Sequence, residues 1–129
     1  MIEQTDLVVT EWIYIPPTNF SENDVISSKV MFDVMPKRAA DKKGIACRFS
    51  YKFLNGNDTI LLYIAEDSYV IDLEDQVDEA EILKMVKNTY SKFNQTFDIR
   101  KLDTVLRNKA LMPLNESGVD LHAIYHLLN

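Results

Sequence analysis

The sequence predicts one α+β domain over residues 1–129, with a four-stranded antiparallel sheet covered on one face by C-terminal helices. Two observations lead to this fold class. Between about residues 7 and 73, apolar and polar side chains alternate, as they do in half-buried antiparallel strands. From about residue 77 to residue 128, the apolar side chains recur with helical spacing instead. No repeat or linker divides the 129 residues, so we expect a single domain.

The first two strands are predicted over Leu7–Ile15 and Val25–Met35. The first is rich in β-branched and aromatic residues, and Pro16-Pro17 ends or bends it because proline cannot donate a ladder hydrogen bond. Alternation in the second puts three apolar side chains on one face, Val30, Phe32 and Val34, and puts Lys29, Met31, Asp33 and Met35 on the other. The polar loop "PKRAADKKG" follows.

The third and fourth strands are predicted as a long hairpin. Ile45–Phe53 has its apolar residues at every second position, which is typical of an antiparallel strand. "NGND" supplies the turn, because Gly56 tolerates positive φ. The return strand, Thr59–Leu73, is long enough for a bend or bulge near residues 66–68.

Helical spacing begins in "LEDQVDEAEILKMVKNTYSKF", whose acidic first turns suit the positive end of a helix dipole. Its apolar stripe is Ile82, Met85, Val86, Tyr90 and Phe93. "NQT" predicts a kink or break, with Thr96 as a possible N-cap of a second helical stretch that carries Phe97, Leu102, Val105 and Leu106. "VDLHAIYHLL" is expected to form a final helix with the stripe Leu121, Ile124, Tyr125 and Leu128.

Charge and composition exclude several classes of function. The net charge is −6 and the pI is near 4.8, whereas nucleic-acid surfaces and anionic membranes attract basic proteins. No secretion signal and no apolar run of membrane-spanning length is visible. The single cysteine, Cys47, excludes an internal disulfide and fits a reducing compartment. We therefore expect a cytoplasmic protein with no nucleic-acid partner and no stable membrane insertion.

The candidate chemical sites favour structural explanations. His122 and His126 are spaced as metal-binding pairs are, but Asp120 has a different spacing, so two surface histidines are the favoured interpretation. The acidic run of residues 72–81 lacks the glycine and the glutamate of a calcium loop. Cys47 alternates with apolar neighbours and is expected to be an inert core thiol. The sequence predicts no enzyme, no metal and no cofactor.

The chain has more apolar strand surface than one layer of helices covers. Met31 and Met35 lie opposite Phe32, and Leu61 and Tyr63 lie opposite Leu62. An exposed apolar patch of this kind marks an interface. At this point two interpretations stand side by side: the patch is an interface between copies of the chain, or it is a client-binding surface.

The layout resembles the SecB family of export chaperones over nearly the whole chain. "EWIYIPPTNF" is similar to the family's first strand and the bend after it, and "KVMFDVM" to its second strand. "GIACRFSYKF" and "DTILLYIAEDSYVIDL" match its central hairpin in length. In "LRNKALMPLNESGVDLHAIYHLL" an x-Leu-x-Pro-x-Asn pattern precedes a final helix that contains a tyrosine, at Leu111, Pro113, Asn115 and Tyr125.

The resemblance implies an ATP-independent holdase that binds unfolded or partly folded proteins in an apolar groove. It also implies a homo-oligomer, a tetramer built as a dimer of dimers. The groove residues that it implies are Val30, Phe32, Val34, Leu121, Ile124, Tyr125 and Leu128. The acids expected to dock a partner are Asp58, Glu66 and Asp67.

The sequence also departs from the family. The helix break with prolines that the family has is absent here. The family's acidic hairpin tip, which docks the SecA motor, is reduced to "LNGND". The family's zinc-contacting acidic tail after the last helix is also missing. Some SecB-like proteins instead serve as chaperones for antitoxins. Two functions are thus expected, a holdase in preprotein export or an adaptor dedicated to one protein such as an antitoxin.

Overall fold

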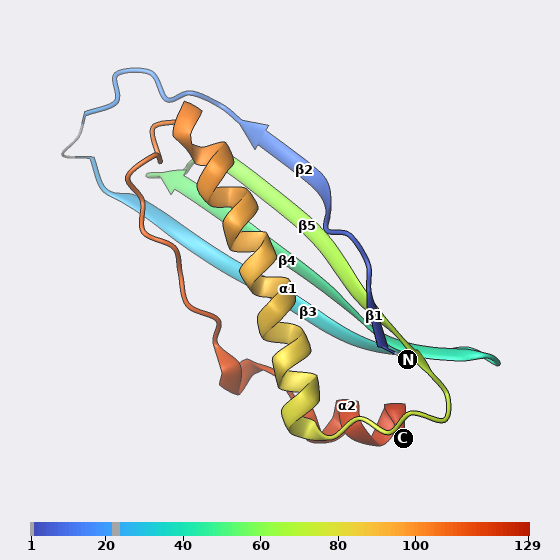
Figure 1. Ribbon diagram of the computed structural model, residues 1–129. Coiled ribbons are helices and arrows are strands. Elements are labelled where there is room, and N and C mark those ends of the chain that lie inside the picture. Colours follow the sequence, from blue (N-terminus) through green and yellow to red (C-terminus); the bar gives the residue numbers. More distant parts are fainter. Residues whose placement is uncertain (1, 22–23) are drawn as a thin grey trace.

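The computed structural model describes residues 2–21 and 24–129 (Figure 1). Its strands are β1 (Ile2–Gln4), β2 (Val8–Tyr14), β3 (Ile26–Arg38), β4 (Lys42–Asn55) and β5 (Asp58–Asp72). Its helices are α1 (Glu79–Arg100), α2 (Leu121–Leu128) and the short 3-10 helices η1 (Lys101–Asp103) and η2 (Glu116–Gly118). The α+β class and the strands-then-helices order are confirmed.

The sheet is antiparallel throughout, and five strands replace the four predicted. β3, β4 and β5 are neighbours in chain order, and both β1 and β2 pair with the far edge of β5. β2 reaches only as far along β5 as Glu66, so the last part of this 15-residue strand takes Ile2–Gln4 as its partner. β4 and β5 pair in continuous register through residues 66–68, where a bend or bulge was predicted, and the register shifts lie between Phe53 and Leu54 of β4 and between Val9 and Glu11 of β2.

The two helical stretches predicted on either side of "NQT" are one helix as far as Arg100, which corrects the sequence analysis. Asp78 is the N-cap and accepts a hydrogen bond from the Glu81 amide at 2.8 Å. Thr96 lies inside the helix, because Phe97 continues the buried stripe one turn after Phe93. Leu102, Val105 and Leu106 lie beyond α1, in η1 and the irregular chain that follows it.

Aromatic rings fill the space between α1 and the two central strands. Tyr63 and Phe93 stack with ring centroids 4.3 Å apart, and Tyr51 meets Phe93 edge-on at 4.6 Å. Such pairs add about 0.5–1.5 kcal/mol each beyond the area that they bury. Phe49, Phe53 and Phe97 complete the cluster and are fully buried. This contact fixes α1 over β4 and β5, and leaves β3 at the margin of the helix layer.

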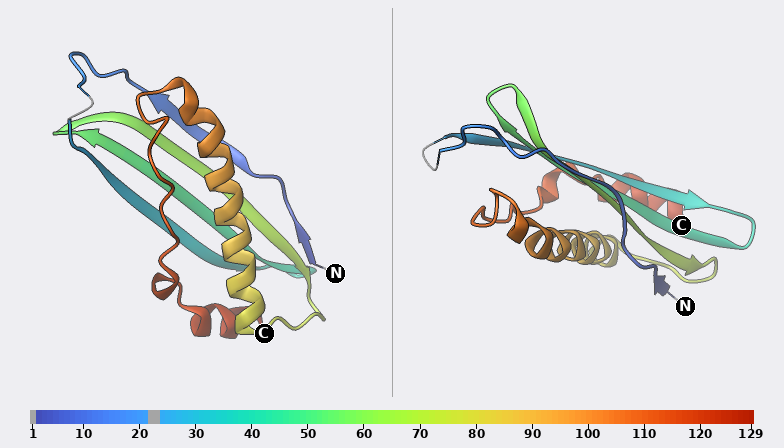
Figure 2. Two further views of the ribbon diagram at one scale, coloured as in Figure 1. Left: turned by 60° about the vertical axis from the view of Figure 1, so that its left-hand side comes forward. Right: turned by 90° about the horizontal axis from the view of Figure 1, so that it is seen from above.

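Both α-helices lie on the same side of the sheet, as the right-hand view of Figure 2 shows. The opposite face keeps apolar side chains in solvent, as the alternation predicted. Met31 is 67% exposed and Met35 is 50% exposed, both on β3. Val8 and Ile13 of β2 are exposed as well.

Replacing Gly44 with alanine should destabilise the fold. A Cβ atom at Gly44 would lie 2.3 Å from the carbonyl oxygen of Tyr69, a backbone atom that cannot move aside without disturbing β5. We expect a loss of about 1–3 kcal/mol of unfolding free energy, measured by urea denaturation. Gly56→Asn is the matched control, because Gly56 has φ +62 and open space around it, and asparagine tolerates that conformation. Equal stability of the Gly44→Ala and wild-type proteins would contradict the close strand approach.

Candidate functional site

A groove runs between β3 and α2. It has a volume of about 290 Å³ and is lined by Phe32, Asp33, Val34, Pro36, Gly118, Val119, Asp120, Ala123, Ile124 and Leu127. One wall is the helix-facing side of β3 and the other is α2 with the turn before it. We call it the β3–α2 groove.

Of the three β3 residues that the sequence analysis assigned to client binding, Phe32 and Val34 line the groove and Val30 does not. Val30, Phe32 and Val34 all face the helix side and are half-buried against the core. The Phe32 ring lies 6.2 Å from that of Phe49 and packs on Gly118, where a Cβ atom would be 2.9 Å from the Phe32 Cζ atom. Glycine at position 118 therefore lets the aromatic ring lie in the groove.

Of the four α2 residues expected to line the groove, only Ile124 does so. Leu121 and Tyr125 are half-buried, but Ile124 is 4% exposed and Leu128 is fully buried. Leu128 belongs to the core, because it points beneath α2 and does not line the groove. The groove instead uses Leu127, which is 61% exposed and which the sequence analysis missed.

Hydrogen bonds hold both ends of α2 in place. The Asp120 carboxylate accepts from the Ala123 amide at 3.1 Å, which caps the first turn. At the other end, Asn129 Nδ2 donates to the Val77 and Tyr125 carbonyl oxygens, both at 3.0 Å. Arg38 of β3 donates to the Leu128 carbonyl oxygen at 3.2 Å. The groove wall is thus fastened to both β3 and the start of α1.

A second hollow of about 360 Å³ lies between α1 and residues 111–114. Here Tyr90 donates from its hydroxyl to the Met112 carbonyl oxygen at 2.7 Å, and Asn94 Nδ2 donates to the same oxygen at 3.4 Å. Leu111 is 42% exposed at the rim. The segment that leads to α2 is therefore tied to α1 and keeps apolar surface open.

The proposed docking acids are not gathered in one place. Asp58 is exposed at the β4–β5 turn, and Glu66 is exposed further along β5 on the face that carries no helices. Arg48 on the neighbouring strand lies 3.7 Å from Glu66.

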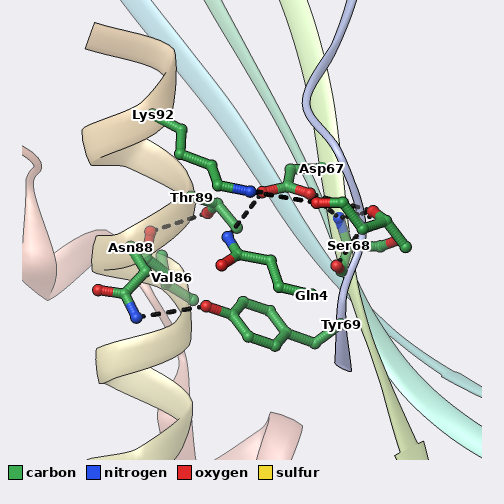
Figure 3. Close-up of polar contacts among 9 residues, drawn as sticks. Gln4, Asp67, Ser68, Tyr69, Val86, Asn88, Thr89 and Lys92 are labelled. Atoms are coloured by element: carbon green, nitrogen blue, oxygen red, sulfur yellow. Dashed lines mark hydrogen bonds and ion pairs between the residues drawn. The ribbon is translucent and has the colours of Figure 1, made fainter. Parts of the chain in front are cut away.

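Asp67 is buried beneath α1, which corrects its assignment as a surface docking residue (Figure 3). Its carboxylate accepts from Gln4 Nε2 at 2.8 Å, from the Thr5 hydroxyl at 3.0 Å and from the Ser68 amide at 2.9 Å. Lys92 of α1 lies 3.5 Å away and also donates to the Thr5 carbonyl oxygen. The carboxylate therefore joins the N-terminal segment, β5 and α1 and leaves no surface for a partner.

The thiol of Cys47 and the metal-ligating residue types were the other candidates for a chemical site. Burial raises the pKa of the Cys47 thiol to about 11, so it is protonated at neutral pH. Within residues 2–21 and 24–129, no group of three or more His, Cys, Asp or Glu residues is arranged to hold a metal ion. No helix in that part of the chain has the length and apolarity needed to span a bilayer.

Comparison with known proteins identifies the fold. No family model matches the sequence, and no curated protein matches it. The SecB-like chaperone Rv1957 of Mycobacterium tuberculosis, solved with a ChAD peptide from the HigA1 antitoxin Rv1956, has a similar structure. The match has a TM-score of 0.56 and 11% identity, and it covers 88% of this chain and 90% of that chain. The chain therefore has a SecB-like α+β fold.

A second solved structure, a protein of unknown function from Streptococcus agalactiae, also aligns with this chain. It has a TM-score of 0.46 and 9% identity, and the alignment covers 89% of this chain and 97% of that one.

Replacing Asp67 with alanine should destabilise the protein, because three or more donors lose a buried carboxylate at once. We expect a loss of about 1–3 kcal/mol, seen as a lower urea midpoint and faster amide exchange in residues 2–5. Glu66→Ala is the matched control, and its exposed position predicts a change within about 0.5 kcal/mol. The reverse ranking of the two variants would show that Asp67 is not the buried anchor.

Proposed function

We propose that the protein is a SecB-like, ATP-independent holdase that binds unfolded or partly folded chains in the β3–α2 groove. One observation carries the proposal. The strand that supplies the apolar wall of the groove is also the free edge of the sheet. A bound chain can therefore contact side chains and backbone of the same residues.

The hairpin geometry determines which backbone groups of β3 are free. The Ala39 amide donates to the Lys42 carbonyl oxygen at 2.7 Å, so these residues form a hydrogen-bonded pair. Bonded pairs alternate along antiparallel strands, and β3 pairs with β4 without a register shift. Odd-numbered residues such as Met31 and Asp33 therefore bond to β4, and even-numbered residues point their backbone groups outward. Pro36, which has no amide hydrogen, fits this assignment because it lies at an even position.

The outward groups of β3 include those of Phe32 and Val34, which line the groove, and those of Val30, one pair further along the strand. Val30, Phe32 and Val34 are all even-numbered, and within residues 2–21 and 24–129 no hydrogen bond occupies their outward amides and carbonyls. An extended segment laid beside β3 can pair with them as an added strand while its apolar side chains enter the groove. This mode favours extended segments with apolar residues at alternate positions.

Such binding needs no nucleotide and little sequence specificity. Backbone hydrogen bonds are common to all sequences, and each apolar side chain that becomes fully buried contributes about 1.5–3 kcal/mol. A few contacts of this size hold an unfolded segment reversibly. The net charge of −6 favours solubility of the loaded protein.

A homo-oligomer, the dimer of dimers implied by the family, is part of the proposal. The exposed Met31, Met35, Val8 and Ile13 support self-association, because a patch of this kind lies at interfaces more often than in solvent. A solution mass near four times 14.9 kDa is the expected result.

An adaptor dedicated to one protein, such as an antitoxin, is the second candidate, and the Rv1957 structure with its antitoxin peptide favours it. Asp58 and Glu66 are apart and Asp67 is buried, so an acidic docking site for SecA has less support. Binding to one defined partner, without binding to several unfolded test proteins, would favour the adaptor function over the holdase function. We propose the cytoplasm as the location of either activity, since the lone Cys47 thiol fits a reducing compartment.

Replacing Leu127 with aspartate should weaken client capture. It places a charge in the apolar groove at a residue that is 61% exposed, so stability should change by less than about 0.5 kcal/mol. We expect about tenfold weaker binding of a reduced, carboxymethylated test protein, and less protection of a denatured enzyme from aggregation. Ile99→Asp is the matched control, because Ile99 is 71% exposed on α1 and lines neither hollow. Equal loss in both variants would remove the groove assignment.

Replacing Val30 with proline should remove one outward donor and leave the pairing with β4 intact. We expect a folded protein that binds an extended peptide of about eight alternating apolar residues up to about tenfold more weakly. Val30→Ala keeps the amide and separates the backbone contribution from that of the side chain. Met31→Pro should instead destabilise the fold, because residue 31 bonds to Ser50 of β4. Tolerance of Met31→Pro with unfolding of Val30→Pro would reverse the register assignment.

A further inference from the structure

Two histidines on the outer side of α2 point toward each other. The Nε2 atoms of His122 and His126 lie 3.1 Å apart, and their ring planes are nearly perpendicular, at 88°. Both side chains are exposed, whereas Ile124 on the same helix is buried in the groove floor. The spacing i, i+4 brings the two rings together on one face of the helix.

This separation matches two neighbouring positions around a single metal ion. A metal–imidazole bond is about 2.0–2.1 Å long, so two bound nitrogens at an angle of roughly 95–110° lie about 3.0–3.4 Å apart. In the metal-free protein, one Nε2 must carry a proton and donate it to the other. A metal ion can occupy that position once both rings carry their proton on Nδ1 and direct the Nε2 lone pairs inward.

Glu79, the first residue of α1, favours this arrangement. Its Oε1 atom lies 3.8 Å from Nδ1 of His122. At this distance the two atoms are not hydrogen-bonded, but the negative charge beside Nδ1 favours the tautomer with the proton on that atom, which leaves the Nε2 lone pair free. Carboxylates occupy this position behind metal-bound histidines in many proteins.

We propose that His122 and His126 bind one divalent transition-metal ion through their Nε2 atoms, with Glu79 orienting His122. Imidazole is a good ligand for Cu²⁺, Ni²⁺ and Zn²⁺, and the general affinity order places Cu²⁺ first. Among the residues that the structure describes, no third His, Cys, Asp or Glu completes the set, so water fills the other positions. The site is therefore open, unlike a structural zinc site with four protein ligands.

Metal binding at this position would stabilise one wall of the β3–α2 groove. α2 has only 8 residues, and a helix this short is marginal without external support. An ion that binds both histidines requires consecutive helical turns, so it stabilises the folded α2 by mass action. The site does not depend on the proposed chaperone activity, because metal binding is measured without a client.

The test is a titration of the full chain with CuCl₂ and NiCl₂ in a buffer that does not chelate metals. Calorimetry should show one saturable site, and the electron paramagnetic resonance spectrum of the Cu²⁺ form should show two nitrogen ligands. His122→Ala and His126→Ala should each weaken binding by at least about tenfold, since each removes one of two ligands. Glu79→Gln should weaken binding by a smaller factor and leave the two-nitrogen spectrum unchanged, because Glu79 is a positioning residue.

The double variant His122→Ala/His126→Ala measures how much Cu²⁺ binds to the chain outside these two histidines. Cu²⁺ affinity in that variant equal to that of the wild type would overturn the site. Binding in which only one histidine matters would also overturn it, because the proposal requires both nitrogens on one ion. Circular dichroism of each variant checks that α2 and the rest of the fold are retained.

Discussion

The packing of α1 across the two central strands is the contact on which the rest of the structure depends. Tyr51 and Tyr63 of the sheet meet Phe93 and Phe97 of the helix in one stacked cluster that is closed to solvent. A single long helix of this kind covers β4 and β5 and does not reach across a sheet this wide. The outer strand β3 is left to a shorter helix, and that division produces the groove.

The groove therefore follows from incomplete coverage. β3 has an apolar face of its own, and α2 covers only part of it, with Phe32 resting on the gap left by Gly118. Asn129 and Arg38 fasten the C-terminal end of α2 to Val77 and to β3, so this wall of the opening is held in place and is not a frayed end of the chain. The open apolar surface thus lies where the helices no longer cover the sheet.

Strand alternation is visible in this sequence, so the sheet and its apolar faces could be predicted, and Phe32 lies on the helix-facing side of its strand as expected. Other features depend on contacts between distant segments. The short β1 pairs with the end of β5 beside the buried Asp67 carboxylate, which accepts from Gln4, and α1 continues past "NQT" because Phe97 extends its buried stripe. Periodicity also cannot say which side of α2 faces β3, so Ile124 was the only assigned α2 residue that lines the groove, and Leu127 was missed.

Pro36 sets a limit on what the open edge of β3 can accept. It is the only outward position between Ile26 and Arg38 without an amide hydrogen, so the ladder available to an incoming strand ends there. At the opposite end, Lys109 occupies the Ile26 carbonyl oxygen at 3.3 Å. A long sheet edge with all its backbone groups unpaired favours edge-to-edge pairing between copies of a protein and the growth of cross-β fibrils. The edge of β3 is bounded on both sides, which limits the length of strand that could pair with it.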